Sequence, residues 1–209
     1  MGHYFGADKT EEMLKWCLDL GVRSVTLYVF STENFKRPRE EVQELMQLFE
    51  ERLQKIMKNK EIHKYKVRIK AIGRLNLLPK RLQKIIKEIE NATKDYDERF
   101  LNFAIAYGGR AEIIDAAKKI ARKILDGELS VEDIDEKVFE KNLYTSHLPK
   151  QDPDLIIRTS GEERLSGFLL YQSAYSELCF IDVYWPEFRR IDLLRAIRTY
   201  QKRKRRFGR

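Results

Sequence analysis

The alternation of strand-like and helix-like segments along the 209 residues is the feature that most constrains the fold. Strands that alternate with helices pair in parallel, because each helix carries the chain back across the sheet. We therefore predict an α/β fold with a mainly parallel central sheet flanked by helices on both faces, as a single domain over residues 1–209. The predicted strands, rich in β-branched and aromatic residues, are 24–30, 65–73, 100–109, 154–159 and 177–185.

The segments between these strands carry apolar residues at helical spacing. Residues 39–60 show the pattern best, with acids at the start and lysines at the end, as the helix dipole favours. Gly21 is a suitable C-cap for the first helix. Ser130 is a suitable N-cap for the helix predicted over residues 131–144. The predicted helices are 8–21, 39–60, 80–93, 111–125, 131–144 and 190–206.

The net charge of +8 is concentrated at the C-terminus. Residues 189–209 hold ten Lys/Arg and one acid, for +9, whereas residues 1–188 hold 31 bases and 32 acids, for −1. Such a basic helix can track phosphates, face a membrane surface or simply be solvated. RNA binding is disfavoured, because no aromatics are interleaved with these arginines and the rest of the chain has no basic stripe, so we predict no nucleic-acid partner.

No apolar run approaches the ~18 residues that a membrane-spanning helix needs, and the N-terminus lacks the apolar core of a signal peptide. We expect a cytoplasmic protein, with peripheral membrane association left open. Cys17 and Cys179 are expected to be buried apolar residues rather than a disulfide. Three scattered histidines, at positions 3, 63 and 147, argue against a zinc cluster.

Unusual residues follow four of the predicted strands. In parallel α/β sheets, ligands bind beyond the carboxyl ends of the strands. There the chain reads "STENFKRP", "GR", "GGR" and "RTSGEER". One such loop is most simply an ordinary turn, but four together predict a binding rim.

The chemistry of these loops favours anions. Guanidinium groups bind phosphate oxygens in pairs, and glycine lets backbone N–H groups approach an anion. Arg158, Arg164 and Ser166, around Gly161, are therefore predicted to hold one diphosphate. No nucleotide-binding glycine motif is present, which argues against a nucleotide.

A second anion site and a metal are also predicted. Arg37, with Asn34 and Ser31 nearby, is placed to hold a second diphosphate. Glu177, at the start of a strand, is predicted to reach the same rim and hold Mg²⁺, which prefers carboxylate and phosphate oxygens. A plain surface glutamate is the alternative for that position.

Five motifs in order, "TLYVFSTENFKRP", "YGGR", "DLIIRTSGEERLSGFLLYQSAYSEL", "WPEF" and "RRFG", make the chain resemble the cis-prenyltransferases, of which undecaprenyl diphosphate synthase is the bacterial type. The resemblance runs from about Gly2 to Gly208. It implies a homodimer that adds isopentenyl diphosphate repeatedly to an allylic diphosphate with Mg²⁺. The product would be a long polyprenyl diphosphate used as a glycan carrier lipid, with farnesyl or geranylgeranyl diphosphate as the starter.

The same resemblance implies roles for individual residues. Arg158, Arg164 and Ser166 match the isopentenyl diphosphate site, and Glu177 matches a magnesium-linked glutamate. Asn34, Ser31 and Phe35 match a loop that assists condensation. The remaining substrate-binding matches are Arg37 and His3 for the allylic diphosphate, and Arg206 and Gly208 for a C-terminal motif that reaches the neighbouring subunit.

The growing product also needs an apolar tunnel. The inner faces of residues 7–20 and 42–57 are suitable walls, although the same stripes can equally be ordinary core.

The chain departs from the family pattern in one important respect. Family members carry, before the "GH" segment, a D-G-N-G-R-W stretch that supplies the catalytic aspartate, and this sequence starts after that point. We expect the 209-residue chain to be an N-terminally shortened synthase with impaired activity; a non-catalytic partner subunit of a heteromeric enzyme is the alternative. Phe35, Glu163 and Ala106 replace the commoner Trp, His and Asn and are expected to be tolerated.

Overall fold

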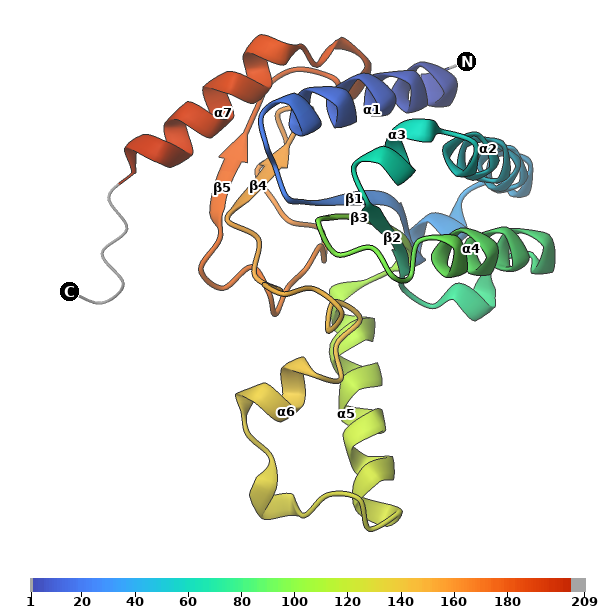
Figure 1. Cartoon of the computed structure of the whole chain (residues 1–209), viewed down its shortest axis with the longest axis vertical. Coiled ribbons are helices and arrows are strands. Elements are labelled where there is room, and N and C mark those ends of the chain that lie inside the picture. The colour runs from blue at the N-terminus through green and yellow to red at the C-terminus, as the bar shows by residue number, and fades with distance from the viewer. Residues whose placement is uncertain (1, 204–209) are drawn as a thin grey trace. The chain divides into compact units, whose positions relative to one another are not determined.

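The computed structural model describes residues 2–203 and confirms the α/β class (Figure 1). The strands are β1 (Ser24–Ser31), β2 (Val67–Ile72), β3 (Arg99–Tyr107), β4 (Leu155–Arg158) and β5 (Glu177–Phe180). The α-helices are α1 (Gly2–Asp19), α2 (Arg39–Met57), α3 (Lys60–Lys64), α4 (Lys80–Ala92), α5 (Gly109–Leu125), α6 (Glu136–Glu140) and α7 (Arg190–Lys202). Short 3₁₀ helices are η1 (Thr32–Lys36), η2 (Leu75–Leu77), η3 (Val131–Asp133) and η4 (Trp185–Glu187).

All strand pairs are parallel, as predicted, but among the described residues they form two ladders rather than one continuous sheet. The first has the order β1-β3-β2 and the second pairs β4 with β5. The chain also divides into two compact units. We call them the terminal unit (Met1–Leu20, Asp152–Ser166 and Gln172–Arg209) and the central unit (Gly21–Gln151 and Gly167–Tyr171). That residues 1–209 form one domain stays a prediction.

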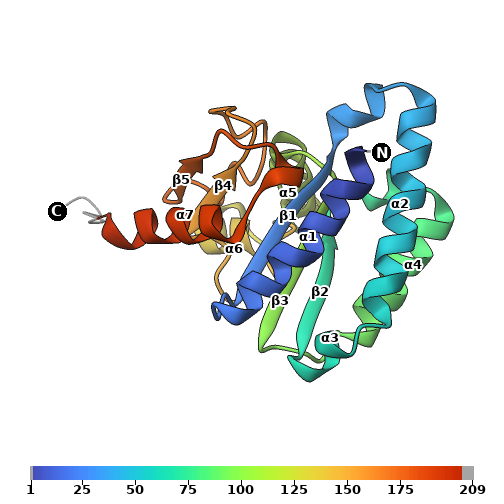
Figure 2. The same cartoon turned by 90° about the horizontal axis from the view of Figure 1, so that it is seen from above.

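The core of the central unit lies around β3, which is buried from Phe100 to Tyr107. Its near-continuous apolar sequence is typical of a strand covered on both faces. The helices α2 and α4 lie side by side, and α4 packs on β2 (Figure 2). The buried face of α4 repeats at helical spacing, with Leu82, Ile85, Ile86 and Ile89. Near the carboxyl end of the sheet, Leu169 packs with Ile72, Ala104 and Tyr107.

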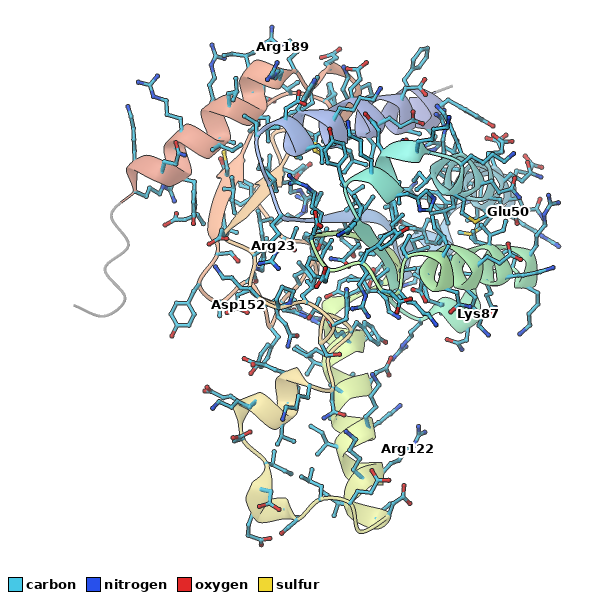
Figure 3. All side chains as sticks on the ribbon, in the orientation of Figure 1. Arg23, Glu50, Lys87, Arg122, Asp152 and Arg189 are labelled. Atoms are coloured by element: carbon cyan, nitrogen blue, oxygen red, sulfur yellow. The ribbon has the colours of Figure 1, made fainter. Side chains whose placement is uncertain are left out.

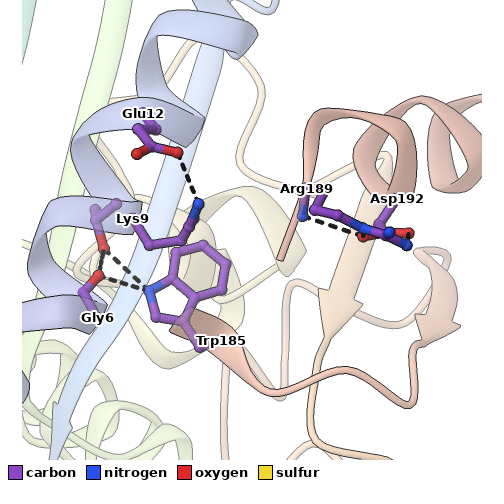
Figure 4. Close-up of polar contacts among 7 residues, drawn as sticks. Gly6, Lys9, Glu12, Trp185, Arg189 and Asp192 are labelled. Carbon is purple, nitrogen blue, oxygen red and sulfur yellow. Dashed lines mark hydrogen bonds and ion pairs between the residues drawn. The ribbon is translucent and has the colours of Figure 1, made fainter. Parts of the chain in front are cut away.

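In the terminal unit, Trp185 fixes η4 to α1 (Figure 4). The indole Nε1 of Trp185 donates to the Gly6 carbonyl at 2.8 Å and lies 3.2 Å from Thr10 Oγ1. Its ring stacks on Phe188 at a centroid distance of 5.4 Å. A Cβ at Gly6 would lie 3.3 Å from the indole Cδ1, so the absence of a side chain there lets the ring pack closely.

Two helix predictions were inaccurate. The helix expected over residues 131–144 is two short ones, η3 and α6. Ser130 caps the first as predicted, by accepting from the Glu132 N–H. Asp135 caps the second by accepting from the Val138 N–H at 2.7 Å, and this new N-cap breaks the helical run. The short helix α3 was not predicted at all.

The prediction that both cysteines are buried is confirmed for Cys17 and only partly for Cys179. Cys17 is buried beside Met13, Cys179 is partly buried on β5, and neither forms a disulfide. Burial raises the pKa of the Cys17 thiol to about 11. Within residues 2–203, every helix is either too short or too polar to span a bilayer.

Candidate functional site

The loop after β1 in the central unit is ordered by its own side chains. Asn34 folds back so that its Oδ1 accepts from the Ser31 N–H at 2.8 Å. The Asn34 carbonyl accepts from the Arg37 N–H at 3.1 Å and ends η1. The predicted group of Ser31, Asn34 and Arg37 therefore lies on one tight turn at the carboxyl end of β1.

Phe35 and Arg37 occupy different surroundings on this loop. Phe35 packs edge-to-face on Phe30 at 4.9 Å and lines an open cleft of about 620 Å³ between α2 and η2. The other lining residues are Val42, Gln43, Met46, Gln47, Glu50, Leu77, Leu78 and Pro79. Arg37 is exposed and pairs with Glu41 at 2.9 Å, one helical turn further on. An exposed pair of this kind is weak, so the guanidinium can turn to an anion at little cost.

The carboxyl ends of β1 and β3 meet closely, as the sequence predicted for its "STEN" and "YGGR" motifs. A Cβ at Gly108 would lie 2.8 Å from Thr32 Oγ1. The next residue, Gly109, donates its N–H to the Gly167 carbonyl at 2.7 Å and would collide with it if it carried a side chain. Gly109 is therefore required for the approach of the neighbouring backbone, whereas a side chain at Gly108 would force the Thr32 side chain to move.

Arg74, at the end of β2, is engaged inside the central unit. Its Nε and Nη2 bind the two carboxylate oxygens of Asp115 at 2.9 and 3.0 Å. The Tyr144 hydroxyl donates to the same carboxylate. The Arg74 guanidinium holds the pKa of Asp115 below its usual range. Arg74 thus serves a structural pairing, and the predicted rim loop "GR" does not present a free guanidinium.

In the terminal unit, Arg158 and Ser166 come together as predicted. The Arg158 Nη1 donates to Ser166 Oγ at 2.8 Å and to the Arg164 carbonyl. The Arg164 side chain instead pairs with Glu162, two residues before it, and remains largely exposed. The loop therefore brings the backbone of Arg164 to Arg158, while its guanidinium is held by a local carboxylate.

This loop has an unusual backbone. Ser160, Gly161 and Ser166 have φ of 74°, 68° and 49°. Left-handed non-glycine residues are uncommon and concentrate at binding sites. The turn is tied to the segment that follows β5, because the Ser160 and Gly161 N–H groups donate to the Val183 and Ile181 carbonyls at 2.8 and 3.1 Å.

Asp182 belongs to this site and was missed from the sequence. A Cβ at Gly161 would lie 2.8 Å from Asp182 Oδ1, so the carboxylate lies directly beside the turn. The side chain of Asp182 is exposed. A signal was present, since Asp182 follows a strand at its carboxyl end in "ELCFIDVYW".

Glu177 does not lie at the same end of the sheet as Arg158, contrary to our expectation. It is the first residue of β5 and pairs with Leu155, the first residue of β4, whereas Arg158 pairs with Phe180. Three residues of a strand separate the two positions by about 10 Å. Parallel strands start at the same end, so the backbone of Glu177 lies at the opposite end of the β4–β5 ladder from Arg158. Glu177 instead forms an ion pair with Arg203.

The described residues offer few protein ligands for the Mg²⁺ that the family resemblance implies. Within residues 2–203, no three His, Cys, Asp or Glu side chains gather into a metal site. Glu177 offers a single carboxylate, and the guanidinium of Arg203 already neutralises it. Oxygen chemistry suits Mg²⁺, which commonly takes one or two carboxylates and completes its shell with phosphates and water. A site using Glu177 would therefore depend on the substrate for most of its ligands.

The other predicted residues are placed as follows. His3 lies in the first turn of α1 and is exposed. Arg206 and Gly208 lie outside the described residues. The two groups predicted to share one rim, around Arg37 and around Arg158, belong to different units, so their common site stays a prediction.

A buried polar chain in the central unit was also not predicted. Asn102 is fully buried in β3 and donates from its Nδ2 to Thr26 Oγ1 at 3.1 Å. Its Oδ1 then faces His147 Nε2 at 2.7 Å, so the neutral imidazole donates from Nε2. Burial lowers the pKa of His147 to about 4, with nearby Lys70 adding to the effect. His147 is therefore a neutral structural hydrogen-bond donor at neutral pH.

Known proteins resemble this chain over its whole length. The profile of the family described as "Putative undecaprenyl diphosphate synthase" matches residues 1–208. A relative from Methanocaldococcus jannaschii is 61% identical over 207 residues, which is 99% of this chain and 74% of the relative. A relative from Methanopyrus kandleri is 60% identical over 208 residues, 100% of this chain and 76% of the relative. Both are named tritrans,polycis-undecaprenyl-diphosphate synthase (geranylgeranyl-diphosphate specific).

Solved structures agree with this result. The lavandulyl diphosphate synthase of Lavandula x intermedia, solved with dimethylallyl diphosphate, superposes with a TM-score of 0.94 at 36% identity, covering 100% of this chain and 88% of the other. A "probable undecaprenyl diphosphate synthase" of Campylobacter jejuni gives 0.83 at 32% identity, covering 99% and 93%. The resemblance predicted from the five motifs is confirmed: the chain belongs to the undecaprenyl diphosphate synthase family of cis-prenyltransferases.

Proposed function

We propose that this chain carries the condensing machinery of a cis-prenyltransferase, which extends an allylic diphosphate with isopentenyl diphosphate to give a long polyprenyl diphosphate that serves as a glycan carrier lipid. The observation that carries the proposal is the Arg158 loop, where a guanidinium, the Ser166 hydroxyl and left-handed backbone meet at the end of a strand. This arrangement suits an oxygen-rich anion. The names of the relatives supply the chemical class.

In this proposal each loop has a separate task. Arg158, Arg164 and Ser166 hold the diphosphate of isopentenyl diphosphate, while Arg37 and His3 hold that of the allylic substrate. The allylic C–O bond breaks, the diphosphate leaves with the bonding electrons, and the isopentenyl double bond attacks the resulting carbocation. The new cation then loses a proton to form the cis double bond. Asn34, Ser31 and Phe35 position the reacting carbons, and Arg206 and Gly208 contact the neighbouring subunit's site.

Electrostatics explains why arginines suit this reaction. The leaving diphosphate gains negative charge as the bond breaks, so fixed cations stabilise the transition state more than the ground state. Mg²⁺, when bound with Glu177 as a ligand, would neutralise diphosphate charge in the same way. The carbocation needs apolar walls that exclude water. The stripes of α1 and α2 remain our candidates for them.

Geranylgeranyl diphosphate is the starter we favour. Eight relatives between 51% and 61% identical are all named as specific for it, and the chain covers at least 74% of each. The sequence alone did not choose between farnesyl and geranylgeranyl diphosphate. An assay that offers each starter separately decides this point.

The activity is tested with radiolabelled isopentenyl diphosphate, each starter and Mg²⁺. The proteins are the 209-residue chain and a chimera that adds the part of the Methanocaldococcus jannaschii relative that this chain does not match. We expect the chimera to put label into long butanol-soluble products, faster with the geranylgeranyl starter. Failure of both proteins to form such products would refute the function.

The site assignment is tested with Arg158→Ala in the chimera. Loss of a shielded charge-assisted contact of roughly 1.5–3 kcal/mol should raise the KM for isopentenyl diphosphate by tenfold or more. The KM for the allylic substrate should change much less. Arg122→Ala, an exposed arginine in the last turn of α5, is the matched control. Equal increases for both substrates would refute the assignment.

We also propose that the protein acts as a cytoplasmic homodimer with peripheral membrane contact. In the central unit, apolar side chains are exposed along α5 and the turns after it: Ile114 at 50%, Leu125 at 85%, Val131 at 60% and Ile134 at 41%. Such residues are suited to cover one another across a subunit interface. Sedimentation of Leu125→Asp with Val131→Asp should show monomers, and an unchanged dimer would contradict this interface.

A further inference from the structure

The outward face of α7 carries a stripe of basic and apolar side chains that the proposed reaction does not use. Leu193 and Ala196 face inward and are buried. On the opposite side, Ile191 and Leu194 remain 45% and 37% exposed. Arg195, Arg198 and Lys202 are exposed on the same side, three and four residues apart. We call these five residues, Ile191, Leu194, Arg195, Arg198 and Lys202, the outer stripe of α7.

The single acid of this helix does not offset the positive charge of the stripe. Asp192 has a side chain only 5% exposed. Its carboxylate accepts from the Arg189 N–H and Nε, both at 3.1 Å, and caps the helix. Arg195 lies 3.7 Å from this carboxylate, but within residues 2–203 Arg198 and Lys202 form no ion pair. Through Arg198 and Lys202, the outer stripe therefore presents positive charge that has no acidic partner in the described part of the chain, beside exposed aliphatic side chains.

We propose that the outer stripe of α7 docks on an anionic lipid surface. Lys and Arg side chains are attracted to acidic headgroups, and aliphatic side chains gain by entering the headgroup boundary. From Ile191 to Lys202 the stripe is about 17 Å long, enough to lie flat on a bilayer. Side chains extend outward along the whole of α7 (Figure 3).

Two other occupants fit the stripe less well. An isologous contact with a second copy would bring the same arginines of both chains together, and like charges repel. A single-stranded nucleic acid would need aromatic side chains for base stacking, and the stripe has none. The docking surface stands independently of the proposed activity, although a long polyprenyl product would enter the same lipid phase.

The test measures binding of the full chain to sedimented vesicles. One set is phosphatidylcholine with about one third phosphatidylglycerol, and the other is pure phosphatidylcholine. We expect binding to the anionic vesicles only, weakening as salt is raised. Each charge contributes roughly fivefold to affinity, so the triple variant Arg195→Gln, Arg198→Gln, Lys202→Gln should bind on the order of a hundredfold more weakly.

A matched control removes the same charge from another helix. Lys80, Lys84 and Lys87 are exposed on α4 at spacings of four and three, but Glu88 lies 3.9 Å from Lys84 and interrupts the charge. Their triple change to Gln should alter binding less than threefold. Loss of the same size in both triple variants would show an effect of net charge alone and would overturn the proposal.

Further arms separate the alternatives. Deleting residues 204–209, which lie outside the described residues, should leave part of the binding to anionic vesicles. If the deletion abolishes this binding and the α7 triple variant does not, the proposal fails. It also fails if wild-type chain ignores anionic vesicles, if it binds single-stranded RNA instead, or if the α7 variant dissociates a dimer without affecting vesicles. Circular dichroism confirms that each variant is folded.

Discussion

Arg203, the residue after α7, forms an ion pair with Glu177, the first residue of β5. One turn earlier, the Tyr200 hydroxyl donates to Asp154 Oδ1 at 2.9 Å. The Glu177 N–H in turn donates to the Asp154 carbonyl at 3.1 Å. The end of α7 is thereby fastened to the starts of both strands of the smaller sheet.

The Arg203–Glu177 pair should contribute little stability, because the two side chains are 52% and 22% exposed. In a double-mutant cycle of Arg203→Gln with Glu177→Gln, urea denaturation should give a coupling free energy of roughly 0.2–1 kcal/mol. Lys202→Gln, one residue away, should show none with Glu177→Gln. A coupling above about 2 kcal/mol would contradict this view of a solvent-screened pair.

Gly161→Ala should destabilise the terminal unit for two reasons. The φ of 68° costs a residue with a Cβ roughly 1–2 kcal/mol, and the new methyl group would meet Asp182 Oδ1 at 2.8 Å. Gly127→Ala is the matched control, since its φ is 73° with open space around it. We expect Gly161→Ala to lower the free energy of unfolding by at least ~1 kcal/mol more than the control. Adding Asp182→Ala should recover that excess; equal losses in the two glycine variants would show that the contact is unimportant.

Stability should fall in mild acid through His147. Its pKa of about 4 lies below the ordinary histidine value of 6.5, so the unfolded chain binds the proton more readily. This contribution is complete above pH 6.5 and is lost as the pH falls towards 4. Between pH 7 and pH 5 the loss is at most about 2 kcal/mol. His147→Gln should be less stable at pH 7 but should lose less on acidification; identical pH slopes in urea denaturation would contradict the assignment.

Trp185→Phe should lower the free energy of unfolding by roughly 1–2 kcal/mol, because it removes the donor to Gly6 and part of the stacked ring. Within a helix, alanine usually raises the free energy of unfolding by ~1 kcal/mol relative to glycine. In the wild type, Gly6→Ala should not give this gain, because the new methyl group would press on the indole of Trp185. In the Trp185→Phe background the same change should stabilise. Thermal unfolding of the four proteins measures both effects, and a stabilising Gly6→Ala in the wild type would refute the contact.

The element types were predictable because the signals are local. β-branched runs and helical spacing depend on neighbouring residues, and β1, β3, α2 and α4 lie where those patterns indicated. The division into two ladders depends on pairing between distant segments, which a periodic pattern does not encode. The break between η3 and α6 was not predicted, because the apolar spacing continues across Asp135 while its side chain caps a new helix.

The sequence predicted which residues form the site better than it predicted their hydrogen-bond and ion-pair partners. Arg158 and Ser166 meet as expected, because both belong to one short loop whose glycine sets the turn. The guanidinium of Arg164 forms an ion pair with Glu162 instead of joining Arg158. A motif does not reveal such a competition between neighbouring side chains. Glu177 begins β5 and so lies at the opposite end of the ladder from Arg158, a position that follows from strand direction and not from the motif.

The close approach of Gly108 to Thr32 has a dynamic consequence. The Thr32 side chain occupies the space where a Cβ at Gly108 would lie, so the loop that carries Asn34 can slide across the first turn of α5 only if that side chain first rotates away. Opening of this loop to admit a substrate is therefore coupled to a rotation of the Thr32 side chain.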